Sequence, residues 1–493
     1  MKIIKLIIIA VILTILVFPA GIFIENWHPL NDLSWPMQFP NTQLNMVSNF
    51  SGPTNFKNIP VYNAYSYMHN LIYVIPHIYF GYVIYKNTFI NFGIQYNSSL
   101  FYNTTYKYTY LNNTIVVASD TNKMLWNFTQ IHQSLFSFNQ LSVGHWNLLS
   151  MYEPLVYRNT VFFTGTDGYL YALSLKGDLL WEKYLATVYF TYIFPDNDYL
   201  YLFGLNFLKS NNTYYVTGES IYKLNLNNNE IEWNTTINTM VDLVNPKINI
   251  NLLPTLWNNT IYIPLGSKIY YLNGSNGKIG VLGIYDSNFT NYLTYSGNAL
   301  YGTFSDGVVK ISIKDGGIIW KFNVTGPNPC TIFNRLVVFA THNGYTYALN
   351  SDTGKEIWNT FTNLGVAGPV TITSNQIIYE IGSINWYIIQ EYIGITALDL
   401  ISGKIIDNIF YISYGLGPGE FKESLHLMGG KPEPLMFNMV IVPNNDVVID
   451  EGLIGGNAFV GYISHYYIWM TSILIIWVSI TIFIILKIHF RKK

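Results

Sequence analysis

Residues that could bind a metal or act as nucleophiles are few and widely separated in this chain. Its nine histidines include no His-x-His or His-x-x-x-His pair, spacings that bring two imidazoles to one face of a strand or helix. The single cysteine, Cys330, excludes an intrachain disulfide, and no Gly-x-Ser-x-Gly motif occurs. We therefore expect no metal site, and the sequence identifies no catalytic residue.

Two motifs resemble binding elements but have simpler interpretations. Gly415-Leu-Gly-Pro-Gly419 follows no strand-to-helix junction, and Pro418 removes one of the amide donors that a phosphate-binding loop uses. The polar segment from Phe421 to Pro434 continues it, and we expect a long loop over one face of the fold. His342 precedes a hairpin turn, where a solvated loop residue is expected.

A repeat between residues 154 and 407 predicts the elements that must position any site. Each copy has a hydrophobic strand, a tight turn, a second strand, a second turn and then often a tryptophan. The clearest copies are Tyr157–Trp181, Asn298–Trp320 and Asn334–Trp358. Their first turns contain Asp-Gly or Asn-Gly, which tolerate the positive φ of two-residue hairpins. Such a unit cannot bury its apolar faces alone, and a period of about 40 to 50 residues is typical of a β-propeller.

The second turns can be aligned along the chain. They lie near Asn122, Gly177, Asn229, Gly277, Gly316, Gly354 and Gly403. Their spacings of 38 to 55 residues predict seven four-stranded units. Strand-like runs from Leu71 to Gln95 and from Leu435 to Ile449 lie outside these units, and together they could form one more blade from both ends of the chain. We favour an all-β propeller of eight blades, with seven as the alternative.

The repeat resembles that of pyrroloquinoline-quinone-like (PQQ-like) β-propellers. Residues 166–173 read Thr-Asp-Gly-Tyr-Leu-Tyr-Ala-Leu, and residues 342–349 read His-Asn-Gly-Tyr-Thr-Tyr-Ala-Leu. The resemblance covers roughly half of the chain, and it implies that each repeat tryptophan packs between neighbouring blades. It also implies that a quinone-dependent enzyme would need a vicinal cysteine pair and calcium-binding acidic residues. One cysteine cannot supply that pair, so we expect no bound cofactor.

Hydrophobic segments lie at both ends of the chain. Ile7 to Ile24 follows Lys2 and Lys5, whereas Tyr466 to Leu486 contains no charge and is followed by a basic tail. The second segment is long enough to cross a bilayer, and both sets of positive charges place the intervening region outside the cell. We therefore predict a signal peptide or N-terminal anchor helix over 1–26, with a cleaved signal favoured. We predict an extracellular β-propeller over 27–460. It is followed by a C-terminal transmembrane helix with a short basic cytoplasmic tail over 461–493.

Composition agrees with an exposed domain that does not bind nucleic acid. Only 11% of residues are charged, and no basic stripe of the kind that contacts phosphates is present. Low charge with abundant Asn, Ile and Tyr resembles surface proteins of thermoacidophilic archaea or their viruses. Asn-x-Ser/Thr sequons make the chain a candidate glycoprotein. They begin at Asn49, Asn97, Asn103, Asn112, Asn127, Asn211, Asn234, Asn258, Asn273, Asn288 and Asn323.

Three functions remain open from the sequence. We favour a non-catalytic binding or assembly platform, held at the cell, viral or host membrane, that contacts a protein or another surface component. The first alternative is a hydrolase of an acidophile that resembles tetrathionate hydrolase, a family with the same repeats and a similar length. The second is a quinone-dependent dehydrogenase. No motif around an aspartate matches the hydrolase, and the lone Cys330 disfavours the dehydrogenase.

Overall fold

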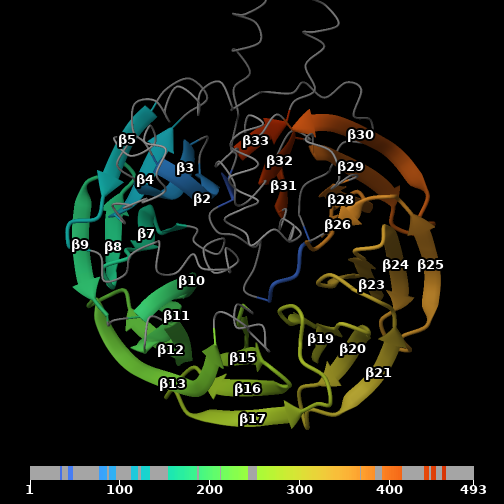
Figure 1. The fold of residues 1–493 in the computed structure, drawn as a ribbon, viewed down its shortest axis with the longest axis horizontal. Coiled ribbons are helices and arrows are strands. Elements are labelled where there is room, and N and C mark those ends of the chain that lie inside the picture. Colours follow the sequence, from blue (N-terminus) through green and yellow to red (C-terminus); the bar gives the residue numbers. More distant parts are fainter. Residues whose placement is uncertain are drawn as a thin grey trace, which may run out of the picture.

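The computed structural model describes residues 34–35, 43–47, 77–85, 88–95, 113–119, 124–133, 154–185, 188–210, 213–242, 253–366, 368–383, 391–413, 438–442, 446–450 and 458–461. These residues form eight antiparallel sheets set around a central axis like the blades of a propeller (Figure 1). They contain no helix. The predicted all-β propeller fold is therefore confirmed, with the favoured number of blades.

The first four blades are named in chain order. Blade 1 consists of β1 (Ser34–Trp35), β2 (His77–Tyr85), β3 (Thr88–Gln95), β4 (Asn113–Ser119) and β5 (Met124–Thr129). Blade 2 consists of β6 (Leu155–Tyr157), β7 (Thr160–Thr164), β8 (Tyr169–Ser174) and β9 (Leu179–Tyr184). Blade 3 consists of β10 (Val188–Asp196), β11 (Tyr199–Ser210), β12 (Thr213–Asn225) and β13 (Glu230–Asp242). Blade 4 consists of β14 (Thr255–Trp257), β15 (Thr260–Leu265), β16 (Lys268–Asn273) and β17 (Ile279–Ile284).

The other four blades complete the ring. Blade 5 consists of β18 (Thr294–Ser296), β19 (Ala299–Phe304), β20 (Gly307–Ser312) and β21 (Ile318–Asn323). Blade 6 consists of β22 (Thr331–Phe333), β23 (Leu336–Ala340), β24 (Tyr345–Asn350) and β25 (Glu356–Phe361). Blade 7 consists of β26 (Gly365–Val366), β27 (Thr371–Ile372), β28 (Ile377–Ser383), β29 (Glu391–Asp399) and β30 (Ile405–Ser413). Blade 8 consists of β31 (Asn438–Val442), β32 (Asp446–Asp450) and β33 (Ala458–Gly461).

The composition of blade 8 corrects one expectation. Strands β2 and β3, from the run Leu71 to Gln95, pair with β4 in blade 1. Strands β31 and β32, from the run Leu435 to Ile449, pair instead with the following strand β33. A composite blade built from both runs is therefore wrong. Each run forms hairpins with its neighbours in sequence, because short connections close at a small cost in chain entropy.

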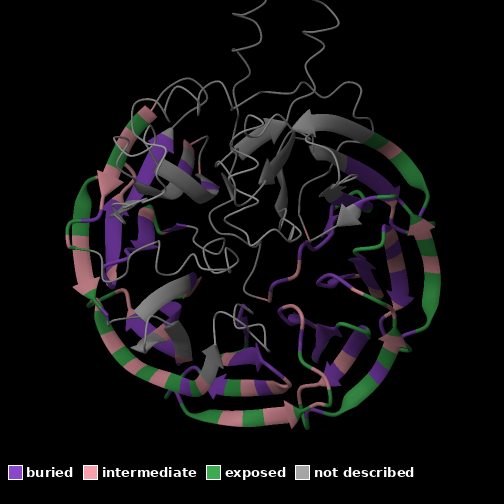
Figure 2. Ribbon diagram, viewed as in Figure 1, coloured by how far each residue is buried: buried purple, intermediate pink, exposed green. Residues whose placement is uncertain are grey.

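Burial follows the radius of the ring. The middle strands β7, β8, β19, β20 and β23 are mostly buried, whereas the outermost strands β9, β17, β21 and β25 hold exposed and partly buried residues, apart from the buried Trp320 (Figure 2). Apolar clusters lie between the faces of successive blades. One cluster joins Leu170 of blade 2 to Leu202 of blade 3, and another joins Val308 of blade 5 to Phe339 of blade 6. Stacking of blades thus buries both faces of each sheet.

A tryptophan fastens each of four blades to the second turn of the next blade. The indole N–H groups donate to backbone carbonyls across the boundary, at distances between 2.9 and 3.1 Å. The pairs are Trp126 with Leu175, Trp233 with Gly274, Trp320 with Ser351 and Trp358 with Leu400. The prediction that the repeat tryptophans pack between blades is confirmed.

A glycine in the receiving turn lets the indole ring approach. Gly403 has a φ of +67°, and a Cβ there would lie 2.5 Å from the ring of Trp358. Gly177, Gly277 and Gly354 have the same relation to Trp126, Trp233 and Trp320. Both the left-handed backbone and the absent side chain are therefore required, and only glycine supplies them together.

Other side chains supply the hydrogen bond to the second turn at two boundaries. Blade 4 has no repeat tryptophan, and the hydroxyl of Tyr285 donates to the carbonyl of Gly316 at 2.9 Å. Between blades 2 and 3, the Nζ atom of Lys183 donates to the carbonyl of Asn229 at 2.7 Å. At these boundaries too, a backbone carbonyl of the second turn accepts a hydrogen bond from a side chain of the preceding blade.

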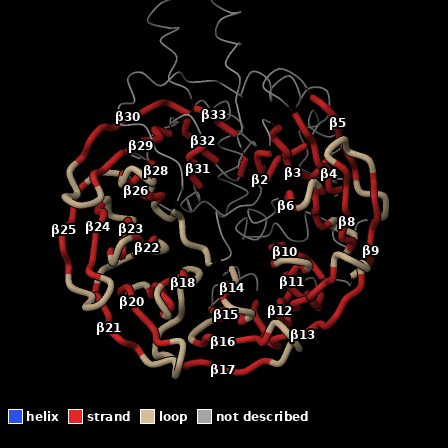
Figure 3. Tube along the Cα trace, turned by 180° about the vertical axis from the view of Figure 1, so that it is seen from behind, coloured by secondary structure: helices blue, strands red, loops and turns tan. Residues whose placement is uncertain are grey.

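Buried threonines make a second series of contacts near the axis, where the innermost strands β14, β18 and β22 lie (Figure 3). Thr294 donates its hydroxyl to the carbonyl of Cys330 at 2.8 Å, and Thr331 donates to that of Val370 at 2.6 Å. Thr255 donates in the same way to Leu293. Each bond joins the innermost strand of one blade to the residue that precedes the next innermost strand.

Residues 43–47 run along these innermost strands and are called the axial segment below. The carbonyl of Gln43 accepts from Tyr295, and the carbonyl of Met46 accepts from Ile372. Asn45 bonds both backbone groups of Ile332 at 2.9 Å. The axial segment therefore contacts blades 5, 6 and 7 in turn. Its side chains Leu44 and Met46 are almost fully buried.

The terminal segments lie outside the described residues, including the predicted signal or anchor over 1–26 and the predicted helix from Tyr466 to Leu486. Within the part of the chain that the structure describes, no helix is long and apolar enough to span a membrane.

Substituting Gly403 by alanine should destabilise the protein more than the same change at Gly297. Both glycines have positive φ, but a Cβ at Gly297 meets nothing within 4 Å, so it measures the backbone cost alone. We expect a loss of about 1 kcal/mol for Gly297→Ala and of roughly 3 kcal/mol for Gly403→Ala, where Trp358 must also move. Urea unfolding of the full chain would measure both, and equal losses would contradict the proposed role of the tryptophan contact.

Candidate functional site

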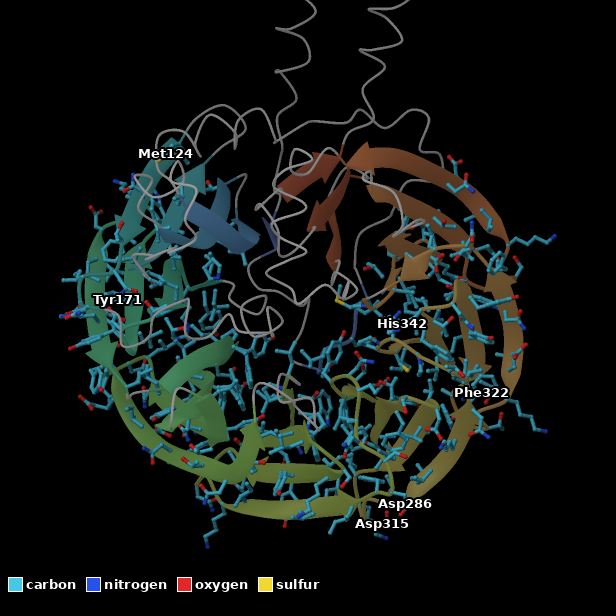
Figure 4. All side chains as sticks on the ribbon, viewed as in Figure 1. Met124, Tyr171, Asp286, Asp315, Phe322 and His342 are labelled. Carbon is cyan, nitrogen blue, oxygen red and sulfur yellow. The ribbon has the colours of Figure 1, made fainter. Side chains whose placement is uncertain are left out.

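Titratable side chains are dispersed around the ring rather than gathered. Among the described residues, no group of three or more His, Cys, Asp or Glu side chains could hold a metal ion. Figure 4 shows Asp286 and Asp315 at the outer rim and His342 on the inner side of blade 6. His342 is exposed in its turn, as expected, and its Nε2 atom lies 3.1 Å from Oδ1 of Asn328. Although the residue is exposed, its contacts with neighbouring atoms reduce the hydration of the ring, and this desolvation lowers the pKa of His342.

One histidine hydrogen-bonds a glutamate at the boundary of blades 1 and 2. His132 Nε2 lies 2.8 Å from Glu182 Oε1, and its ring stacks on Tyr169 with the centroids 4.0 Å apart. In the described part of the chain, no hydrogen bond joins this pair to a serine or cysteine. The geometry therefore supplies a base without a nucleophile, and we interpret it as a contact between blades.

The buried carboxyl of Asp167 lies close by. Its Oδ2 atom accepts the hydroxyl of Tyr171 at 2.6 Å, and its Oδ1 atom accepts the backbone N–H of Tyr169 at 3.1 Å. Burial raises the pKa of Asp167, and these two bonds partly oppose the rise. Both oxygens are used in shaping the first turn of blade 2. Asp167 is therefore a structural turn residue.

Two buried glutamates were not singled out from the sequence. Glu219 on β12 lies between Leu205 and Ile237 in its sheet, and burial raises its pKa to about 8. Glu380 on β28 is fully buried, and burial raises its pKa to about 7. An alignment of strand registers between blades would have identified Glu380, because it occupies the position of Phe339 in blade 6.

The quinone and calcium of the resembled enzymes do not fit the residues near the axis. Leu44 and Met46 of the axial segment are buried beside the innermost strands, and the hydroxyls of Thr294 and Thr331 are used on backbone carbonyls. Cys330 is buried and alone, and burial raises the pKa of its thiol. The described residues therefore offer no cysteine pair and no acidic cluster for such a group.

The outermost strands carry a repeated β-bulge immediately before the tryptophan position. In six blades one residue is left out of the pairing register there. These residues are Leu125, Leu180, Glu232, Ile319, Ile357 and Ile406. The bulge turns the tryptophan toward the next blade and the extra residue toward solvent. Five of the six are apolar, and they are between 39% and 54% exposed.

Five exposed apolar residues lie where blades 6 and 7 meet at the rim. This docking face consists of Ile357 and Phe361 on β25, Ile401 in the second turn of blade 7, and Ile405 and Ile406 on β30. The bond from Trp358 to the carbonyl of Leu400 holds β25 against that turn. Strands β25 and β30 are neighbours at the rim in both views of the ring (Figures 1 and 3).

The sequons avoid this sector. The six that fall on described residues, Asn127, Asn234, Asn258, Asn273, Asn288 and Asn323, are all exposed. The other five, Asn49, Asn97, Asn103, Asn112 and Asn211, lie outside the described residues. Thirteen asparagines follow Asn323 in the sequence, and none of them begins a sequon. Blades 6, 7 and 8 therefore carry none.

Comparison with known proteins supports the repeat and the fold. A family model described as outer membrane protein assembly factor BamB matches residues 255–411, which span blades 4 to 7. The chain carries PQQ-type repeats. No curated protein matches it.

Three solved structures are similar to this chain to different degrees. BamB from Moraxella catarrhalis is 14% identical over 56% of this chain and 78% of its own, with a TM-score of 0.36. The computationally designed Ika8 protein is 12% identical over 85% of this chain and 99% of its own, with a TM-score of 0.47. A europium-containing methanol dehydrogenase is 10% identical over 86% of this chain and 89% of its own, with a TM-score of 0.51. At this identity the last similarity shows a shared fold and nothing about activity.

We expect oligosaccharide on Asn127 and Asn323, because both are exposed on outermost strands within a sequon. Glycopeptide mass spectrometry of the protein from the cells that make it would detect this modification. Asn359 is the matched control, since it is exposed and follows Trp358 as Asn127 follows Trp126, but it begins no sequon. Unmodified Asn127 and Asn323 in that protein would contradict the prediction.

Proposed function

We propose that this protein is a membrane-anchored extracellular β-propeller, of archaeal or archaeal-virus type, that serves as a binding or assembly platform. The observation that carries the proposal is the docking face: exposed apolar side chains on two adjacent blades, within a run of three successive blades that carries no sequon. Glycans elsewhere on the rim would leave this sector accessible. A cluster of apolar side chains at one place on a rigid surface is typical of an interaction site.

A protein is the partner that this face fits. The exposed charged residues Lys355, Glu356 and Lys404 flank the apolar side chains, so both signs of charge border the cluster. An apolar centre with a polar rim is the usual composition of a protein interface. A lipid-contacting surface would instead combine a wide apolar face with mainly basic flanks.

Substituting Ile406 by aspartate should remove the protein partner. A charge at the centre of a desolvated apolar contact weakens binding roughly 30-fold or more. Leu125→Asp is the matched control, because Leu125 occupies the same bulge in blade 1 and is 44% exposed against 39% for Ile406. The full-length chain and both variants would be isolated after cross-linking in the cells that make them, and associated proteins quantified by mass spectrometry.

The proposal predicts a protein that is present with the wild type and with Leu125→Asp but depleted with Ile406→Asp. The same associated proteins in equal amounts with both variants would refute the docking face. Circular dichroism of the two variants would establish that each retains its β-sheet content.

The proposed orientation rests on the basic residues that flank the two terminal hydrophobic segments. An epitope tag after Lys493 should resist protease added to intact cells, whereas a tag inserted at Asn276, in an exposed turn of blade 4, should be cleaved. Permeabilised cells are the control in which both tags are accessible. Cleavage of the C-terminal tag on intact cells would contradict the proposed topology.

A further inference from the structure

The boundary between blades 6 and 7 contains a carboxyl group at a position that holds an apolar side chain in blades 2, 3, 4 and 6. In blade 7, Tyr379 pairs with Thr371 of the innermost strand, and Glu380 is the next residue along β28. In blade 6, Val338 pairs with Thr331 in the same way, so the residue equivalent to Glu380 is Phe339. By the same register, Phe163 stands there in blade 2 and Ile263 in blade 4. Glu380 therefore projects toward the preceding blade from a core position.

The facing residue of blade 6 is changed in a matching way. Thr346 pairs with Ala340, at the position that Leu170 holds in blade 2 and Val308 in blade 5. Between blades 5 and 6 the two positions hold Val308 and Phe339, which pack in one apolar cluster. Between blades 6 and 7 they hold Thr346 and Glu380, and the hydroxyl of Thr346 hydrogen-bonds Oε2 of the carboxyl.

Among the residues that the structure describes, no cation balances this carboxyl. Thr346 and Ala348 face it from β24, Thr396 lies directly opposite on β29, and the hydroxyl of Thr362 contributes a further hydrogen bond. None of these groups is charged, and no charged side chain of the described residues affects the pKa of Glu380. Oε1 of Glu380 and the hydroxyl of Thr396 are buried without a hydrogen-bond partner among the described residues. The site therefore accommodates a protonated carboxyl, which can donate one hydrogen bond, better than a carboxylate.

We propose that Glu380, Thr346 and Thr396 form an acid-stabilised contact between blades 6 and 7, which loosens when Glu380 ionises. The direction follows from proton linkage. Burial holds the pKa of Glu380 near 7, above the usual value of 4.5 for a glutamate in the unfolded chain. Above pH 4.5 the unfolded chain therefore releases a proton that the folded chain retains, and stability falls as pH rises through 7. The docking face spans the same two blades, so loosening this contact would change its shape.

Glu380→Gln tests the proposal, because an amide has the shape of the protonated carboxyl and does not ionise. In the full-length wild-type chain, we expect ionisation of Glu380 to lower the equilibrium constant for folding roughly 100-fold between pH 4.5 and pH 7. In Glu380→Gln this part of the pH dependence should be absent. Urea unfolding at a series of pH values would give the slope of the free energy of unfolding against pH for the wild type and for Glu380→Gln, and the two slopes would then be compared.

Amide hydrogen exchange locates the effect. In the wild type, protection of β24 and β28 should decrease toward pH 7 after correction for the intrinsic exchange rate, while in Glu380→Gln it should stay constant. Glu219→Gln is the matched control, since it removes a buried carboxyl from β12 in blade 3 and should leave β24 and β28 as in the wild type. Glu380→Leu restores the apolar residue and should also abolish the local pH dependence.

If the free energy of unfolding of Glu380→Gln depended on pH as steeply as that of the wild type, the proposal would be overturned. Protection of β24 and β28 that does not change with pH in the wild type would overturn it as well.

Discussion

The contact between a tryptophan and the backbone turn of the following blade is the constraint on which the ring depends. A sheet of four short strands has apolar residues on both faces, so it is stable only when a neighbour covers each face. The bond from Trp358 to Leu400, with Gly403 beneath the ring, fixes the height and angle at which the neighbour packs. Hydrophobic burial alone is non-directional and would not select one angle.

The boundaries without this contact show which part of it is essential. Tyr285 reaches Gly316 from a different position in its blade, and Lys183 reaches Asn229 with an ammonium group instead of an indole. The side chains differ in size and charge, but each donates to a carbonyl of the receiving turn. An unbonded carbonyl at the edge of a packed boundary is costly, so a donor is retained even where no tryptophan supplies it.

Local signals in the sequence were sufficient to predict blades 1 to 7, whereas the composition of blade 8 and the contacts between distant segments were not predicted from them. Turn pairs such as Asp306-Gly307 and tryptophans such as Trp320 carry their meaning within a few residues, and they predicted the hairpins and the packing of the ring. The axial segment bonds partners about 290 residues away, as Asn45 does with Ile332, and no pattern within it indicates that pairing. Glu380 was missed for a related reason, because a glutamate is unusual there only once the blades are aligned by register.

The bulges determine how the docking face can be recognised. An outermost strand has free backbone groups that could template another strand, and the unpaired extra residue at Ile357 and Ile406 disrupts the regular spacing of those groups. The same bulge directs an isoleucine outward in place of a polar residue. Blade 3 has Glu232 at this position, so an apolar side chain is not required to form the bulge. The rim around blades 6 and 7 therefore disfavours strand addition while presenting apolar side chains, and a partner there would bind through side-chain packing.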